Sequence, residues 1–143
     1  MILDIVKFNN DPNGILRKKN IDVKNNEHCK QLISNMFDTL RSSNGVGLAA
    51  PQVAKNLNMF IISFNGFEET FINPEILAYG YAEEMAETCL SVPNIPMFVT
   101  RKSKVKIQYY NRNWQFKQQE FDGLLSRIIQ HEYDHLKGKL IID

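Results

Sequence analysis

Residues 122–138, DGLLSRIIQHEYDHLKG, decide the fold because they predict an amphipathic helix with two histidines on its apolar side. Asp122 is a good N-cap, and the apolar residues after it recur at helical spacing. At about 100° per residue, both histidines fall on the same side as Leu124, Leu125, Ile128, Ile129 and Leu136. His131 and His135 are therefore expected to point toward the core.

Two other patterns complete the predicted fold. Residues 27–41 have helical periodicity behind a cap at Asn25 or Asn26, and Cys29 falls in the apolar stripe as a buried thiol. From about residue 58 to residue 121, short runs rich in β-branched and aromatic residues predict strands. These runs are MFIISF, TFINPEI, VKIQYY and WQFKQQEF, with turn residues YNRNWQ predicting a hairpin between the last two.

The fold class that follows is α+β, with antiparallel β-sheets packed around the C-terminal helix and an amphipathic helix near the N-terminus. A length of 143 residues and 43% hydrophobic content fit a single domain over residues 1–143. A net charge of +1 provides no basic stripe for nucleic acid or a membrane surface. Two unpaired cysteines and no signal peptide or membrane span lead us to expect a cytoplasmic protein.

The H-E-x-x-H motif at residues 131–135 predicts a metal site. Histidines at positions i and i+4 lie one above the other on a helix, close enough to bind one ion. Glu132 is rotated away from that pair, where a carboxylate can accept a proton from water beside the metal. The alternative is that these five residues match the motif by chance and that the two histidines are hydrogen-bonded core residues. Their shared position on the apolar side of a capped helix argues against that alternative.

The third ligand must come from upstream of this helix. Metzincins place a third histidine six positions after the second, where this chain has Ile141. Upstream candidates are His28, Cys29 and Cys89, together with many carboxylates. Cys29 belongs to a core stripe and His28 is expected on the surface, whereas Cys89 in AETCLSVP lies between a strand and a turn at Pro93. A Cys/His/His set leaves one position open, as catalytic sites do.

The glycine-rich segment GVGLAAPQ, residues 45–52, also matches part of a dinucleotide-binding fingerprint. That interpretation fails because the segment follows a helix and runs into Pro51, whereas the fingerprint follows a strand and opens a helix. A permissive turn, or a backbone lying close to a ligand, remains. Gln52 can then donate its side-chain amide to a developing oxyanion.

Three segments, GVGLAAPQ, ETCLS and QHEYDHLKG, resemble in order and spacing the three motifs of peptide deformylase. This family of metalloenzymes removes the N-formyl group from nascent polypeptides. The opening ILDIVKFNNDPNGILRKKNIDV is also similar to the family's N-terminal segment, so the resemblance covers nearly the whole chain. It implies an α+β fold in which the H-E-x-x-H helix packs against antiparallel sheet.

The resemblance also implies roles for single residues. Cys89, His131 and His135 would hold one divalent metal ion per chain, Fe²⁺ in the cell, with Zn²⁺, Ni²⁺ or Co²⁺ able to replace it. Glu132 would be the catalytic carboxylate, and the formyl oxygen would be held by Gln52 and the backbone N–H of Leu90.

The expected substrates are N-formylmethionyl peptides of nascent chains. Helix geometry, together with the resemblance, predicts an apolar slot for the methionine side chain, lined by Val46, Leu124 and Ile128 and capped by the mobile guanidinium stem of Arg127. The residues assigned to substrate binding are Gly45, Val46, Gly47, Thr88, Leu124, Arg127 and Ile128.

Several features depart from the resembled family. Thr88 replaces a usual glycine and would be strained at a positive φ, and the segment NIPMF lacks an arginine found in several bacterial members. The chain ends at Asp143, before a helix linked to ribosome docking, as bacteriophage-encoded members do. A monomer with weak ribosome association is expected. The alternative functions are a metal amidase with altered acyl or peptide specificity and a non-catalytic metal-binding domain.

Overall fold

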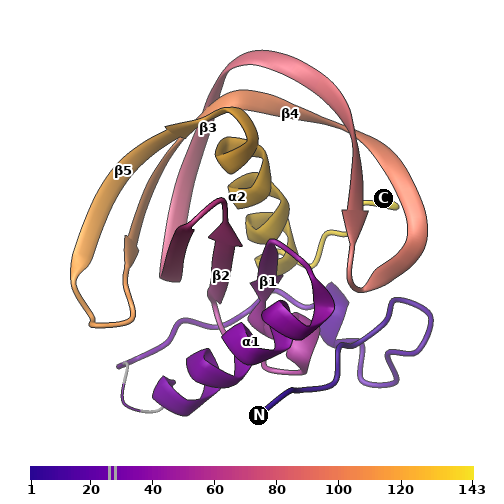
Figure 1. Ribbon diagram of the computed structural model, residues 1–143, viewed down its shortest axis with the longest axis vertical. Coiled ribbons are helices and arrows are strands. Elements are labelled where there is room, and N and C mark those ends of the chain that lie inside the picture. The colour runs from indigo at the N-terminus through magenta and orange to yellow at the C-terminus, as the bar shows by residue number, and fades with distance from the viewer. Residues whose placement is uncertain (26, 28) are drawn as a thin grey trace.

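The computed structural model describes residues 1–25, 27 and 29–143 (Figure 1). Its strands form one antiparallel sheet in chain order, β1-β2-β3-β4-β5. The elements are η1 (Ile15–Arg17), α1 (Lys30–Ser43), β1 (Gly47–Ala49), η2 (Ala50–Val53), β2 (Met59–Phe64), β3 (Phe67–Cys89), β4 (Val92–Tyr110), β5 (Phe116–Asp122) and α2 (Gly123–Leu136). The predicted α+β class is confirmed.

The two helices pack against opposite faces of the sheet. Strand β2 shows this by alternation, because Met59 and Ile61 belong to a buried cluster with α1, whereas Phe60 and Ile62 belong to a cluster with α2. Figure 1 shows α2 inside the curve of the sheet and α1 below β1 and β2. Helix α2 is thus enclosed, and its inward side chains are shielded from water.

The long β3–β4 hairpin brings Cys89 to α2. Its pairing shifts at three places, including a bulge between Tyr79 and Ala82 where Gly80 has a φ of 86°. Bulges bend a strand and increase its twist, so the hairpin curves over α2 (Figure 1). The pair of Cys89 with Val92 closes its tip. Strand β4 therefore begins at Val92, and the turn predicted at Pro93 is wrong.

The first helix begins later than its sequence predicts. Cys29 occupies the N-cap position of α1, and the side chain of Asn25 instead accepts a hydrogen bond from the Glu27 N–H at 3.1 Å. A cap at Asn25 is therefore wrong, while Asn26 and His28 lie outside the described residues. The expectation for Cys29 is confirmed, because its thiol is buried in the core beside α1.

Other boundaries agree with the sequence. Strand β2 and helix α2 coincide with the runs MFIISF and GLLSRIIQHEYDHL, and Asp122 occupies the N-cap position of α2. The glycine-rich segment differs, because Gly47–Ala49 form the edge strand β1 and not a turn. No helix in the described part of the chain is long and apolar enough to cross a membrane.

Candidate metal centre

Cys89 at the end of β3 meets His131 and His135 of α2 at one point. One potential ligand atom from each residue lies within 4.8 Å of the others, and all three side chains are buried. The Cys89 Sγ atom is 3.4 Å from His135 Nε2. The three residues singled out by the sequence are therefore brought together by the fold.

This cluster fits a divalent transition metal. Thiolate and imidazole donors suit iron, zinc, nickel and cobalt, and three protein ligands leave a position open. One buried polar atom at the cluster, Glu132 Oε1, has no hydrogen-bond partner among the described residues. Unpartnered buried polar atoms are costly, and they are expected where an ion and water complete a site.

Electrostatics at the cluster favour a positive charge. Burial opposes protonation of His131, but the Glu132 carboxylate and hydrogen bonds with Cys89 and Glu87 outweigh it and raise the His131 pKa to about 10. Burial lowers the pKa of His135 well below its usual value, and the charges of His131 and Arg101 add to that effect. His131 therefore holds a proton more readily than His135 does.

Glu132 lies beside the cluster in a space that Gly47 leaves open. Its carboxylate is buried, with Oε2 at 3.9 Å from His131 Nε2. Burial raises the Glu132 pKa to about 7 against the opposing charges of His131 and Arg101. A Cβ atom at residue 47 would lie 2.6 Å from Glu132 Oε2, so a larger residue in β1 would displace the carboxylate.

Gln52, on the short helix η2, directs its amide toward the cluster. Its Oε1 accepts a hydrogen bond from the Ala49 N–H at 2.9 Å, and its Nε2 donates to Ser91 Oγ at 3.1 Å. Because a backbone donor requires the oxygen, the amino group must face Cys89, whose Sγ is 3.7 Å away. Gln52 therefore presents a fixed donor at the cluster.

The N-terminal segment holds Gln52 and the hairpin tip together. The Val6 N–H donates to the Gln52 carbonyl and the Phe8 N–H to the Ser91 carbonyl, both at 2.8 Å. Between them, Lys7 Nζ donates to the Leu90 carbonyl at 3.2 Å. These bonds fix the backbone that carries Leu90, next to Cys89.

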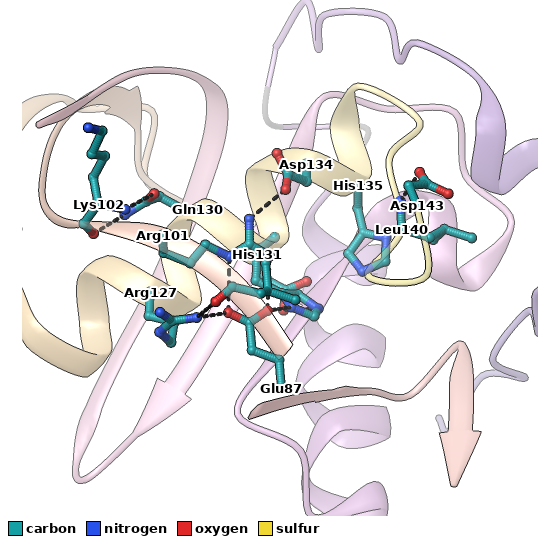
Figure 2. Close-up of polar contacts among 12 residues, drawn as sticks. Glu87, Arg101, Lys102, Arg127, Gln130, His131, Asp134, His135, Leu140 and Asp143 are labelled. Atoms are coloured by element: carbon teal, nitrogen blue, oxygen red, sulfur yellow. Dashed lines mark hydrogen bonds and ion pairs between the residues drawn. The ribbon is translucent and has the colours of Figure 1, made fainter. Parts of the chain in front are cut away.

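A buried carboxylate, Glu87, supports His131 from behind, as Figure 2 shows. Its Oε1 lies 2.9 Å from His131 Nδ1, and Arg101 donates to both carboxylate oxygens at 2.9 and 3.0 Å. Burial opposes its ionisation, yet the bonds from His131 and Arg101 hold the Glu87 pKa at about 2. A charged acceptor at Nδ1 leaves Nε2 of His131 free to bind a cation.

Two arginines connect Glu87 to the rest of the fold. Arg101 also donates to Asp134 of α2 at 2.6 Å, so it joins β3, β4 and the helix. Arg127 Nη1 donates to Glu87 from the other side. Sequence reasoning missed this network, although one signal was available. Glu87 precedes Cys89 by two positions, and alternation along a strand places such residues on one face.

A cavity of about 170 Å³ opens beside the cluster. All four residues of the predicted methionine slot line it: Val46, Leu124, Arg127 and Ile128. Val46 and Leu124 are 41% and 50% exposed, which places them at the mouth. Glu132 and His131 also line the cavity, so a side chain bound there lies next to the candidate metal ligands.

Arg127 differs from its prediction. Its side chain is not mobile, because it is buried and donates to Glu87 and to the carbonyls of Val99 (2.9 Å) and Glu83. A helix surface usually leaves arginine free to move, but here three acceptors of the hairpin hold the guanidinium. It is a fixed part of the cavity wall.

The strain considered for Thr88 does not arise. In the described part of the chain, positive φ values outside glycine occur at Asn44, Ala54, Asn65, Asn73, Asn94 and Trp114. Thr88 is not among them. It lies in β3 at a pairing irregularity between Glu87 and Cys89, with an exposed side chain at the edge of the cavity.

Size alone does not select this site. A larger open hollow of about 590 Å³ lies on the sheet face formed by β3, β4 and β5. Its lining, which includes Glu75, Gln108 and Glu120, contains no histidine or cysteine. The smaller cavity is distinguished by the residues that line it, including His131 and Glu132, and not by its volume.

An H-E-x-x-H helix whose histidines meet a third ligand, with the glutamate beside them, defines a metal-dependent hydrolase. The family model described as Polypeptide deformylase matches residues 2–143. The chain belongs to this family. It is a peptide deformylase, the hydrolase that removes the N-formyl group from the N-terminal methionine of nascent polypeptides and releases formate.

Individual relatives agree with the family assignment. The chain is 46% identical to the peptide deformylase of Karelsulcia muelleri, over 100% of this chain and 78% of that protein. The crystal structure of peptide deformylase from Thermotoga maritima superposes with a TM-score of 0.94 at 36% identity, covering 100% of this chain and 97% of that one. The Synechococcus elongatus enzyme, solved in complex with actinonin, gives 0.93 at 36% identity, covering 99% and 77%.

Proposed function

We propose that deformylation takes place at the cluster of Cys89, His131 and His135, with these residues as metal ligands and Glu132 as the catalytic carboxylate. The observation that carries the proposal is the meeting of three buried ligand atoms within 4.8 Å beside a buried glutamate. When bound, a divalent metal polarises a carbonyl group and lowers the pKa of water. The chain's own residues then position the substrate and move protons.

Glu132 is the proton carrier. Its carboxylate accepts the proton of the attacking water and transfers it to the amine nitrogen that leaves as the formyl C–N bond breaks. The unpartnered Oε1 atom supports this role, because a buried carboxylate oxygen without a hydrogen bond is ready for a substrate or water proton. The space left by Gly47 permits that position.

Gln52 and Leu90 stabilise the negative charge that develops on the formyl oxygen. Gln52 Nε2 is held toward Cys89 by the Ala49 N–H on its oxygen, so this donor needs no reorientation during the reaction. The Leu90 N–H provides the second donor from a hairpin tip fixed by Lys7. Preorganised donors of this kind favour the transition state over the substrate.

The substrates are N-formylmethionyl peptides, and the first side chain occupies the cavity beside His131. Val46, Leu124 and Ile128 offer it apolar contacts. Thr88 also lines the cavity. Gly45 and Gly47, on either side of Val46 in the chain, are proposed to contact the peptide backbone. A flexible unbranched thioether suits a narrow slot of this kind.

Iron in the ferrous state is the proposed native ion, with Zn²⁺, Ni²⁺ or Co²⁺ able to replace it. One thiolate and two imidazoles support this choice, because these donors bind all four metals. Elemental analysis of protein isolated without oxygen tests it. Zinc as the sole metal under those conditions would contradict the preference.

We further propose that the chain acts as one domain and as a monomer, in the cytoplasm, on chains leaving the ribosome. The continuous sheet, with α1 and α2 on its two faces, supports a single domain. A net charge of +1 supports weak ribosome association, because tight binding to RNA needs an excess of basic residues. Analytical ultracentrifugation tests whether the chain is a monomer, and co-sedimentation with ribosomes tests the weak association.

Formate release from formyl-Met-Ala-Ser tests the proposed site. Protein loaded with Ni²⁺ without oxygen is compared with Glu132→Gln at equal metal content. We expect turnover in the parent and a loss of at least about 100-fold in the variant. Turnover of acetyl-Met-Ala-Ser in place of the formyl peptide would indicate an amidase of altered acyl specificity. One bound metal per chain without turnover of either peptide would indicate a non-catalytic metal-binding domain.

A further inference from the structure

Arg127 separates two cavities. One is the slot of about 170 Å³ beside His131, and the other is a hollow of about 250 Å³ on the far side of the guanidinium. Arg127 and Leu124 line both cavities. The remaining wall of the second cavity comes from the β3–β4 hairpin and includes Tyr81, Met85 and Lys102.

We propose that Arg127 is a specificity-determining residue that closes the inner end of the slot and thereby limits the length of the substrate's first side chain. This inference rests on the proposed function, because it takes the cavity beside His131 as the site of that side chain. The buried Arg127 lies deep in the slot, whereas Val46 and Leu124 form its exposed mouth. In this proposal, an unbranched side chain that enters at the mouth extends toward Arg127.

The wall is rigid because the guanidinium is bound to both strands of the hairpin. Nη2 donates to the Glu83 carbonyl of β3, and Nη1 donates to the Val99 carbonyl of β4 at 2.9 Å and to Glu87. Moving Arg127 aside would break three hydrogen bonds and separate its guanidinium from the buried Glu87 carboxylate, which is costly. A longer substrate side chain therefore cannot push the wall open cheaply.

Removing the guanidinium would join the two cavities without removing the support of His131. Glu87 would still accept hydrogen bonds from Arg101 and from His131 Nδ1. Turnover of methionine-sized substrates should fall, because Glu87 loses one of its donors, but it should stay measurable. Longer unbranched side chains should gain access to the hollow beside Met85.

The test compares two formyl-X-Ala-Ser peptides, with X as norleucine or as 2-aminodecanoic acid, which is longer by several methylene groups. The measured quantity is the ratio of kcat/KM for the long and short substrates in Ni²⁺-loaded protein. Any general loss of activity or metal cancels in this ratio. We expect the parent to favour norleucine strongly.

In Arg127→Ala the ratio should rise by at least about tenfold, since each methylene group buried is worth about fourfold. This rise should come from a lower KM for the long substrate. Arg127→Lys is the matched control, because it keeps a long cationic stem and should keep the parent ratio. Arg127→Gln keeps a polar side chain that is shorter than arginine, and it should give an intermediate rise. If Arg127→Ala does not fold, the ratio measured for Arg127→Gln tests the proposal instead.

A second change checks where the long side chain goes. Met85→Trp in the Arg127→Ala background refills the hollow and should return the ratio toward that of the parent. Ratios within twofold of the parent in both Arg127→Ala and Arg127→Gln would overturn the proposal. Equal use of both peptides by the parent would overturn it too. Absence of turnover by the parent would instead refute the proposed function, and this inference with it.

Discussion

His131 Nδ1 lies 2.9 Å from Glu87 Oε1, so a candidate metal ligand of α2 is oriented by a carboxylate of β3. Cys89, the ligand from the hairpin, follows Glu87 by two positions. One end of a strand therefore provides both a ligand and the group that orients a second ligand. The relative position of β3 and α2 determines the geometry of the whole site.

Glu87→Gln should weaken metal binding by about 10- to 100-fold, because the charged acceptor that fixes the His131 ring is lost. The change also leaves Arg101 and Arg127 without their buried counter-charge and should lower stability by about 3 kcal/mol. Competition with a chromophoric chelator measures the affinity. Glu69→Gln is the control, since that β3 carboxylate accepts from Tyr109 on the sheet. Unchanged affinity in Glu87→Gln would contradict the role of this contact.

Gly47→Ala should reduce kcat by about 100-fold or more while the protein remains folded and binds metal. The added Cβ would lie 2.6 Å from Glu132 Oε2, so it must push aside the carboxylate that transfers the proton. Melting temperature and metal content, measured beside formate release, separate this effect from unfolding. Full activity in the variant would show that Glu132 need not occupy the position seen here.

The elements with strong periodicity could be predicted from the sequence. Apolar residues at helical spacing marked α2 correctly, and a short run rich in β-branched and aromatic residues marked β2 to its end residues. The strand Gly47–Ala49 could not be predicted, because three residues are too few to show alternation. Its pairing with β2 comes from tertiary structure.

The cluster of candidate ligands could be predicted because few residue types bind transition metals, whereas its supporting contacts could not. Glu87 meets Arg101 only because of the register of a hairpin with three irregularities, and no local pattern encodes that register. Arg127 was expected to be mobile for the same reason. Its acceptors, Glu83 and Val99, belong to strands whose course over α2 is set by bulges.

Asp143→Asn should lower stability at neutral pH by less than about 1 kcal/mol, because the ion pair of Asp143 with Arg17 (2.7 Å) is partly exposed. Burial opposes ionisation, but hydrogen bonds from Arg17 and the Leu140 N–H together outweigh it and lower the Asp143 pKa below 3.8. A depressed pKa in the folded state stabilises at higher pH, and this contribution is lost as the pH falls through the folded pKa.

The difference between parent and Asp143→Asn should therefore be constant above about pH 5 and shrink as the pH falls below 3.8. Urea unfolding at pH 6 and at the lowest pH where the parent stays folded measures it. Arg17→Met is the matching change on the other partner and should show the same trend. A difference that grows with acidity would contradict this assignment.

Gln52→Glu should reduce kcat by about 100- to 1,000-fold, as expected for the loss of one preorganised donor. The substitution changes little in shape, and one carboxylate oxygen can still accept from the Ala49 N–H. The other oxygen replaces the Nε2 donor and adds negative charge 3.7 Å from Cys89 Sγ. Ser91→Ala is the matched control, because it removes a neighbour of Nε2 at 3.1 Å but leaves the donor in place, and it should cost less than about tenfold. Equal losses in the two variants would mean that Gln52 acts by packing at the hairpin tip and not by donating to the formyl oxygen.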